Sequence, residues 1–193
     1  MMEEASGKKV LITGGVRSGK SRFAINSALS YPTPRVFLAT AEPLDQEMHE
    51  RILRHRAERK DQFLTIEEPL DLAEKILQMD FNPSVVIIDC ITTWLGNLYH
   101  HLVENEPAIR NRMNRLTEVV GNNKRTMILV TNEVGLGVIS NHALGRRFVD
   151  ALGTLNQELA RICHEVVFMN CGIPQMIKGT LQDAKVDCSI KAC

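Results

Sequence analysis

The sequence predicts an α/β fold with a doubly wound, mostly parallel sheet. Short apolar runs without polar alternation are typical of strands buried on both faces of a parallel sheet. Helical patterns separate these runs, and a glycine-rich loop stands between the first run and the first helix. The length of 193 residues suits one domain with one sizeable core. We therefore expect a single domain over residues 1–193, with a core at 8–178 and a loosely held tail at 179–193.

The expected strands are apolar and rich in β-branched residues, and the expected helices between them carry an apolar stripe at helical spacing. The segment VVIID is the clearest strand, because four β-branched residues precede its terminal carboxylate. In chain order, the expected strands are Lys8–Thr13, Arg35–Thr40, Phe63–Ile66, Val85–Asp89, Thr126–Thr131 and Glu165–Met169. The expected helices are Lys20–Leu29, Leu44–Lys60, Leu70–Met79, Trp94–Leu102, Ala108–Val120 and Gly145–His164.

The composition excludes several classes of function. Lysine plus arginine number 23, as do aspartate plus glutamate, so the formal net charge is zero. Proteins that hold nucleic acid or an anionic membrane by bulk charge are strongly basic, so neither partner is expected here. No apolar run approaches the roughly 18 residues of a membrane span, and the polar N-terminus does not resemble a signal peptide. The expected compartment is the cytoplasm, with the five cysteines as reduced thiols.

A phosphate-binding loop follows the first expected strand. Its residues fit the pattern G-x-x-x-x-G-K-[ST], in the required setting between a strand and a helix. The glycines let backbone N–H groups surround a phosphate, and the helix adds its positive N-terminal end. Lys20 supplies a charge to the outer phosphates, and Ser21 supplies a hydroxyl ligand for Mg²⁺. The loop residues are Gly14, Gly15, Val16, Arg17, Ser18, Gly19, Lys20 and Ser21.

Polar residues at the carboxyl ends of the other strands are further candidates, because ligands of open parallel sheets bind there. They are Thr40, Ala41 and Glu42 after the second strand, Asp89 after the fourth, and Asn132 with Glu133 after the fifth. Asp89 has the form of a Walker B carboxylate, which holds the metal directly or through water. The alternative is that Asp89 caps the helix that begins near Ile91.

The expected helix Leu44–Lys60 carries a histidine among arginines. Its acids crowd the first half and its bases the second, which a solvated helix with charges complementing its dipole also explains. Met48, Ile52, His55 and Arg59 share one stripe at helical spacing. Neighbouring guanidinium groups disfavour a protonated imidazole, and a neutral histidine can attack phosphorus to form a phosphoramidate. A histidine on a helix is more often structural, so both interpretations stand at this point.

Several sequence blocks together resemble one enzyme family. They are ITGGVRSGKS, FLATAEPLDQEMHERILRHR, EEPLDL, IIDCITTWLGNL, LVTNEVGLGV, RRFVDALGTLNQELA and CGIPQMIKG, in this order. The series is similar to the bifunctional adenosylcobinamide kinase / adenosylcobinamide-phosphate guanylyltransferase family of cobalamin biosynthesis. The resemblance runs from about Val10 to Lys178, and it implies a RecA-like P-loop NTPase fold.

The resemblance also implies the chemistry. A nucleoside triphosphate, ATP or GTP, phosphorylates a hydroxyl of adenosylcobinamide with Mg²⁺. GTP then gives GMP to His55, releasing pyrophosphate, and the phosphorylated cobinamide takes the GMP to give adenosylcobinamide-GDP. The resemblance also implies that the protein forms a homotrimer. The implied nucleotide contacts are the phosphate loop, Ala39, Thr40, Ala41, Arg56, Ala57, Glu58, Arg59, Glu67 and Asp89, with Ser21 and Asp89 as metal ligands and Lys20 and His55 as catalytic residues.

Two other functions remain open on the residues alone. A P-loop kinase of small molecules with no covalent intermediate would explain the phosphate loop and Asp89, but not His55. A regulatory module that binds GTP and hydrolyses it slowly would explain the loop alone. If one phosphate loop serves two reactions, the γ-phosphorus and the α-phosphorus must both be reached. We therefore expect the segment between Glu42 and Phe63 to move.

Overall fold

The computed structural model describes residues 7–103, 105–138 and 140–179. The side chains of Arg51, His55, Glu58 and Lys60 also lie outside the described part. The expected tail, apart from its first residue, and its cysteines Cys188 and Cys193 fall beyond it as well. Within the described ranges, no helix is long and apolar enough to cross a membrane.

A seven-stranded sheet forms the centre of the molecule, in the order β3-β2-β4-β5-β1-β6-β7. Every neighbouring pair is parallel except β6 and β7. The predicted mostly parallel sheet is therefore confirmed. The strands are β1 Lys9–Gly14, β2 Arg35–Ala39, β3 Leu64–Glu67, β4 Val85–Asp89, β5 Thr126–Val130, β6 Glu165–Asn170 and β7 Ile173–Lys178.

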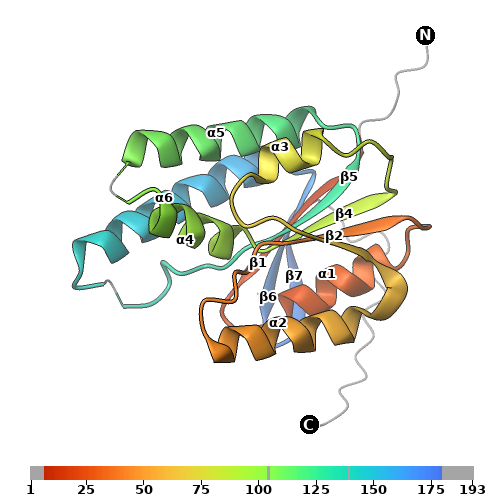
Figure 1. Cartoon of the computed structure of the whole chain (residues 1–193), viewed down its shortest axis with the longest axis horizontal. Coiled ribbons are helices and arrows are strands. Elements are labelled where there is room, and N and C mark those ends of the chain that lie inside the picture. The colour runs from red at the N-terminus through yellow and green to blue at the C-terminus, as the bar shows by residue number, and fades with distance from the viewer. Residues whose placement is uncertain (1–6, 104, 139, 180–193) are drawn as a thin grey trace.

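Helices cover both faces of the sheet (Figure 1). On one face, α1 Lys20–Ala28 and α2 Gln46–Arg59 lie side by side, and the short 3-10 turn η1 Lys60–Gln62 follows α2. The other face carries α3 Leu72–Leu77, α4 Ile91–His101, α5 Glu106–Asn122 and α6 Ala143–Ile162. Alternate residues of the central strands enter the two cores, as Leu11 and Ile12 of β1 show. The doubly wound arrangement follows from this.

Side chains cap the N-termini of α2 and α5. Asp45 accepts a hydrogen bond from the backbone N–H of Met48 at 2.7 Å, so α2 begins at Gln46 rather than at Leu44. Asn105 caps α5 in the same way, at 3.2 Å from the N–H of Ala108. Element boundaries of this kind depend on one side chain, and periodicity alone does not locate them.

The strand β7 is missing from the expected set. The expectation that Glu165–Met169 is the last strand is wrong, because β7 follows it. Cys171 and Gly172 turn the chain with positive φ of 49° and 81°, and β7 then pairs antiparallel with β6. Pro174 obscured this strand, because proline is tolerated only at sheet edges and bulges. At the edge of the sheet, where β7 lies, proline does no harm.

Candidate functional site

The phosphate loop joins β1 to α1 in a conformation that its glycines make possible. Gly14 and Gly19 have φ of 143° and 94°, in the region that favours glycine. A Cβ on Gly14 would lie 2.3 Å from the carbonyl oxygen of Met169, so the loop also requires a residue without a side chain there. Arg17 takes a positive φ of 56° near the tip of the loop. The predicted loop therefore has the backbone shape that places successive N–H groups around an anion.

Lys20 lies inside this loop and is only 7% exposed. Its ammonium group donates to the carbonyl oxygen of Gly15 at 2.5 Å and approaches Ser18 Oγ at 3.5 Å. Burial lowers the pKa of Lys20 below its usual value, while Cys90 and Asp89 nearby act in the opposite direction. The structure thus brings the lysine of the loop close to the carboxylate at the end of β4.

Asp89 ends β4 beside the carboxyl ends of two other strands. It stands in register with Ala39 of β2 and Val130 of β5. The alternative role of Asp89 as a helix cap is wrong, because Cys90 is the N-cap of α4 and its sulfur accepts from the N–H of Thr93. Asp89 is half-buried, and its Walker B role stays a prediction.

Thr40 connects the ends of β2 and β4. It is fully buried, and its hydroxyl donates to the carbonyl of Cys90 at 2.9 Å and accepts from the N–H of Cys90 at 2.8 Å. The side-chain amide of Asn97 in turn donates to the carbonyl of Thr40 at 2.8 Å. In this structure the side chain of Thr40 therefore holds the backbone next to Asp89. Its predicted contact with nucleotide stays a prediction.

The helix α2 is anchored to the sheet at its C-terminal end. Arg59 is 5% exposed, and its guanidinium carbon lies 3.8 Å from the centroid of the Phe37 ring. Phe63 packs edge-on against the same ring, with centroids 6.3 Å apart. Met48 and Ile52 are half-buried, as the predicted stripe requires. The fourth member of the stripe, His55, has its side chain outside the described part of the structure.

Arg56 and Glu67 bring the end of α2 near the end of β3. Their side chains are exposed and stand 3.9 Å apart. Ala57 is exposed on α2, and the side chain of Glu58 is outside the described part. Ala39, Thr40, Ala41, Glu67, Asp89 and the phosphate loop thus all lie at the carboxyl edge of the sheet. That edge is where a doubly wound sheet binds ligands.

Three further polar residues at this edge were not singled out from the sequence. Thr13 is the last residue but one of β1, Thr131 follows β5, and Asn156 comes from α6. Thr131 is fully buried and its hydroxyl donates to Asn156 Oδ1 at 2.9 Å. Asn156 interrupts the apolar stripe of its helix, flanked by the buried Leu155 and Leu159. A polar residue within an apolar stripe is the signal that could have found it.

Ser21 and Asp89 suit a Mg²⁺ ion that is also held by nucleotide phosphates. Mg²⁺ in such sites takes one or two protein oxygens and completes its shell with phosphate oxygens and water. A serine hydroxyl and a carboxylate, next to a loop shaped for phosphate, match that requirement. Within the described ranges, no group of three or more His, Cys, Asp and Glu side chains could hold a metal ion by itself.

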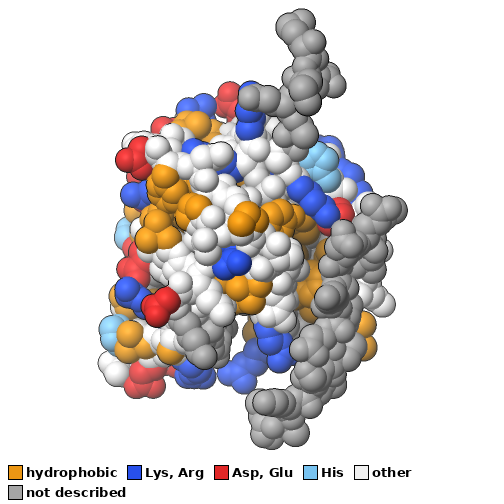
Figure 2. Space-filling view, turned by 90° about the vertical axis from the view of Figure 1, so that its right-hand side faces the viewer, with side chains coloured by type: hydrophobic (Ala, Val, Ile, Leu, Met, Phe, Trp, Pro, Cys, Tyr) orange, Lys and Arg blue, Asp and Glu red, His pale blue; other side chains and the backbone are white. Residues whose placement is uncertain are grey.

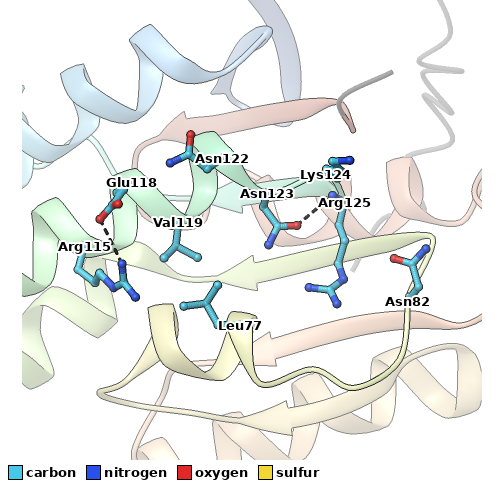
Figure 3. Close-up of a pocket in the computed structure, with 9 residues that line it drawn as sticks. All are labelled: Leu77, Asn82, Arg115, Glu118, Val119, Asn122, Asn123, Lys124 and Arg125. Atoms are coloured by element: carbon cyan, nitrogen blue, oxygen red, sulfur yellow. Dashed lines mark hydrogen bonds and ion pairs between the residues drawn. The ribbon is translucent and has the colours of Figure 1, made fainter. Parts of the chain in front are cut away.

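A cavity of about 400 Å³ lies away from this edge, where the strands begin (Figure 3). The arginines that line the cavity already form hydrogen bonds or ion pairs within the protein. Arg125 donates to the carbonyls of Ile76, Met79 and Phe81, and Arg115 pairs with Glu74 and Glu118. Figure 2 shows the face of the molecule at this end, where basic side chains are scattered among uncharged and apolar ones. No predicted site residue lines the cavity, so we assign it no part in the chemistry.

Comparison with known proteins decides the family. The model of the family described as cobinamide kinase / cobinamide phosphate guanyltransferase matches residues 10–177. The chain belongs to this family. The family match spans nearly the whole described fold, from β1 to the last residues of β7.

The similarity extends to curated relatives of the cobinamide kinase / cobinamide phosphate guanyltransferase family. The bifunctional adenosylcobalamin biosynthesis protein CobP of Pseudomonas aeruginosa is 40% identical over 169 residues, which cover 88% of this chain and 96% of the relative. The corresponding protein CobU of Escherichia coli is 35% identical over 181 residues, covering 88% of this chain and 99% of the relative.

Solved structures with little sequence similarity confirm the fold alone. The flagellar accessory protein FlaH of Methanocaldococcus jannaschii has a TM-score of 0.51 at 13% identity, covering 91% of this chain and 80% of its own. The RadB recombinase has a TM-score of 0.51 at 15% identity, covering 85% and 74%. The predicted RecA-like P-loop fold is therefore confirmed.

Proposed function

We propose that this family member catalyses two consecutive steps of cobalamin biosynthesis. It phosphorylates adenosylcobinamide with ATP or GTP, and it then transfers GMP from GTP through a guanylyl-histidine to give adenosylcobinamide-GDP and pyrophosphate. One observation carries the proposal. A phosphate loop holds Lys20 beside Asp89 in a chain that is 35–40% identical to bifunctional adenosylcobalamin biosynthesis proteins.

In the kinase step, the loop binds the triphosphate and orients its γ-phosphorus. Backbone N–H groups from Gly14 to Ser21 surround the phosphates, and the ammonium group of Lys20 exchanges the carbonyl of Gly15 for phosphate oxygens. Ser21 and Asp89 would hold Mg²⁺, which neutralises charge on the phosphate oxygens. The phosphate loop thereby positions the group that is transferred, and positioning provides most of the catalysis in reactions of this type.

In the guanylylation step, an imidazole nitrogen of His55 attacks the α-phosphorus of GTP. A nitrogen–phosphorus bond forms, the bond to the bridging oxygen breaks, and pyrophosphate leaves. A phosphate oxygen of the phosphorylated cobinamide then attacks the same phosphorus and releases His55. The buried contact of Arg59 with Phe37 supports this assignment, because it ties the helix that carries His55 to the strand β2, whose carboxyl end lies at the same edge of the sheet as the loop.

The nucleotide contacts proposed for α2 and β3 are Arg56, Ala57, Glu58, Arg59 and Glu67. Arg59 reaches a nucleotide only if it leaves the Phe37 ring, so its role as a ligand depends on movement of the segment between Glu42 and Phe63. Glu67 offers a carboxylate that could accept from guanine N–H groups or from a ribose hydroxyl. A homotrimer, a cytoplasmic location and the absence of a nucleic-acid partner are further proposals that rest on the resemblance and the composition.

Turnover of adenosylcobinamide tests the overall reaction. Purified protein is incubated with adenosylcobinamide, Mg²⁺ and either ATP or GTP, and the corrinoids are separated by chromatography. We expect the phosphorylated corrinoid with either nucleotide, and adenosylcobinamide-GDP only when GTP is present. Nucleotide binding without corrinoid turnover would instead support a regulatory module, and phosphorylation without the GDP product would support a plain kinase.

The covalent step has its own test. Incubation with α-labelled GTP and Mg²⁺ should give an acid-labile, alkali-stable protein adduct, and the His55→Ala variant should not form it. His49→Ala is the matched control, since His49 is an exposed histidine on the same helix. An adduct that survives His55→Ala would overturn the assignment.

A further inference from the structure

Glu133 lies directly beside the phosphate loop. It follows β5 by three residues, and its backbone N–H donates to the carbonyl of Gly14, the first loop residue, at 3.2 Å. Its side chain is half-buried at the carboxyl edge of the sheet. Neither the nucleotide contacts nor the metal ligands proposed above include this carboxylate.

The carboxylate of Glu133 is oriented by two donors that bind the same oxygen. Oε1 accepts from Thr13 Oγ1 at 2.9 Å and from Asn156 Nδ2 at 3.1 Å. Asn156 is itself held, because its Oδ1 accepts from the buried Thr131 hydroxyl. Among the residues that the structure describes, neither a hydrogen bond nor an ion pair engages Oε2. The second oxygen is therefore held in place without a partner from the described part of the chain.

A purely structural role would not need this arrangement. The two hydrogen bonds that tie β1, β5 and α6 together require only one acceptor oxygen, which an amide also supplies. Partially buried carboxylates without a cation pay a desolvation penalty. The second, open oxygen beside a phosphate-binding loop is what a group that accepts a proton during phosphoryl transfer would provide.

We propose that Glu133 is the general base of the kinase step, an inference that rests on the proposed function. Oε2 takes the proton of the acceptor hydroxyl. The hydroxyl oxygen forms a bond to the γ-phosphorus, the bond from that phosphorus to the β–γ bridging oxygen breaks, and the nucleoside diphosphate leaves. In protein kinases a carboxylate takes this role, because it orients the hydroxyl of the substrate and accepts its proton.

The guanylylation step does not need this base. A neutral imidazole attacks through a nitrogen that carries no proton, and the phosphorylated corrinoid attacks through a phosphate oxygen that is already ionised. Glu133 therefore belongs to one half-reaction only, and its loss should separate the two activities.

The substitution Glu133→Gln tests this division. Glutamine keeps an acceptor oxygen for Thr13 and Asn156, so the hydrogen-bonded frame is retained while the base is lost. We expect kcat of adenosylcobinamide phosphorylation to fall by at least about 100-fold, since general bases contribute roughly 10²–10⁴-fold. The KM for the nucleotide should stay within about twofold of the wild-type value, because Glu133 does not contribute to nucleotide binding in the ground state. The control Glu165→Gln removes a carboxylate that pairs with Lys8 at 2.8 Å where the strands begin, and it should leave kcat unchanged.

Two measurements on the same Glu133→Gln preparation complete the test. It should form the α-labelled adduct and convert pre-phosphorylated cobinamide to adenosylcobinamide-GDP at the wild-type rate. Undiminished phosphorylation by the variant would overturn the proposal. Loss of adduct formation together with phosphorylation would also overturn it, because it would show a structural role. A wild-type protein without either activity would instead overturn the proposed function on which the inference rests.

Discussion

The substitution Thr40→Val tests whether the hydroxyl of Thr40 stabilises the backbone of Cys90, the residue next to Asp89. Valine has nearly the shape of threonine, so it fills the same space in the fully buried site. It removes the hydroxyl that both donates to the carbonyl of Cys90 and accepts from its N–H. The variant therefore leaves the N–H of Cys90 without its partner, while the carbonyl of Cys90 keeps the N–H of Trp94, and it creates no cavity.

The magnitude follows mainly from the N–H of Cys90. A buried donor that loses its partner costs about 1–3 kcal/mol. The carbonyl of Cys90 still accepts from the N–H of Trp94 at 3.1 Å, so its loss of the Thr40 hydroxyl adds little. We expect the free energy of unfolding to fall by about 1–3 kcal/mol. In a chain of this length each kcal/mol lowers Tm by roughly 2–4 °C, which corresponds to a fall of roughly 2–12 °C.

Urea and thermal unfolding, followed by circular dichroism, measure this change. Thr65→Val is the matched control, because Thr65 is half-buried on the neighbouring β3 and its hydroxyl has no hydrogen bond to the described residues. It should change the free energy of unfolding by less than about 0.5 kcal/mol. A Thr40→Val variant as stable as the control would refute the reasoning, since the hydroxyl would then not be bracing the end of β4.

Two further predictions concern residues outside the proposed site. Lys9→Met should lower the free energy of unfolding by about 2–4 kcal/mol in urea titrations. The reason is that the buried ammonium group of Lys9 donates to the carbonyls of Gly7, Asn123 and Arg125 at 2.7–2.9 Å. The control Lys8→Met removes only the exposed pair with Glu165, so it should lower the free energy of unfolding by less than about 1 kcal/mol. Burial, with Glu106 beside it, raises the pKa of Tyr99 from 10.0 to about 12. The resulting stabilisation is complete below pH 10 and is lost as the pH rises through about 12, so wild type should lose stability relative to Tyr99→Phe over that window in urea midpoints. Equal Lys9→Met and wild-type midpoints, or a pH-independent difference for Tyr99→Phe, would contradict these two expectations.

Much of the fold could be predicted because its determinants are local. The central strands of the parallel sheet are buried on both faces, so runs such as VVII, which precedes Asp89, are apolar throughout and stand out in the sequence. The strand β7 alternates between exposed and half-buried residues and contains Pro174, so its pattern is weak. Its pairing with β6 depends on the turn at Cys171 and Gly172, which places an edge strand where the sequence predicted none.

The candidate site likewise contains a part that is local in sequence and a part that depends on contacts between distant residues. The phosphate loop is contiguous in sequence, so its place between β1 and α1 could be predicted, and Gly14 and Gly19 take the positive φ that glycine favours. Arg59, a nucleotide contact implied by the resemblance, packs in the structure on Phe37, which is 22 positions away in sequence. The partners of Glu133 come from β1 and α6, at separations of 120 and 23 residues. Contacts of this kind follow from the topology of the sheet, and no local pattern specifies them.

The central claim is that this chain carries GMP on His55 between its two substrates. The most direct measurement is peptide mapping by mass spectrometry after incubation with GTP and Mg²⁺, under alkaline conditions that preserve a phosphoramidate. We predict a mass increase of one GMP residue on the peptide that contains His55, and its disappearance when phosphorylated cobinamide is added. GMP on another residue, or an adduct that phosphorylated cobinamide leaves in place, would contradict the claim.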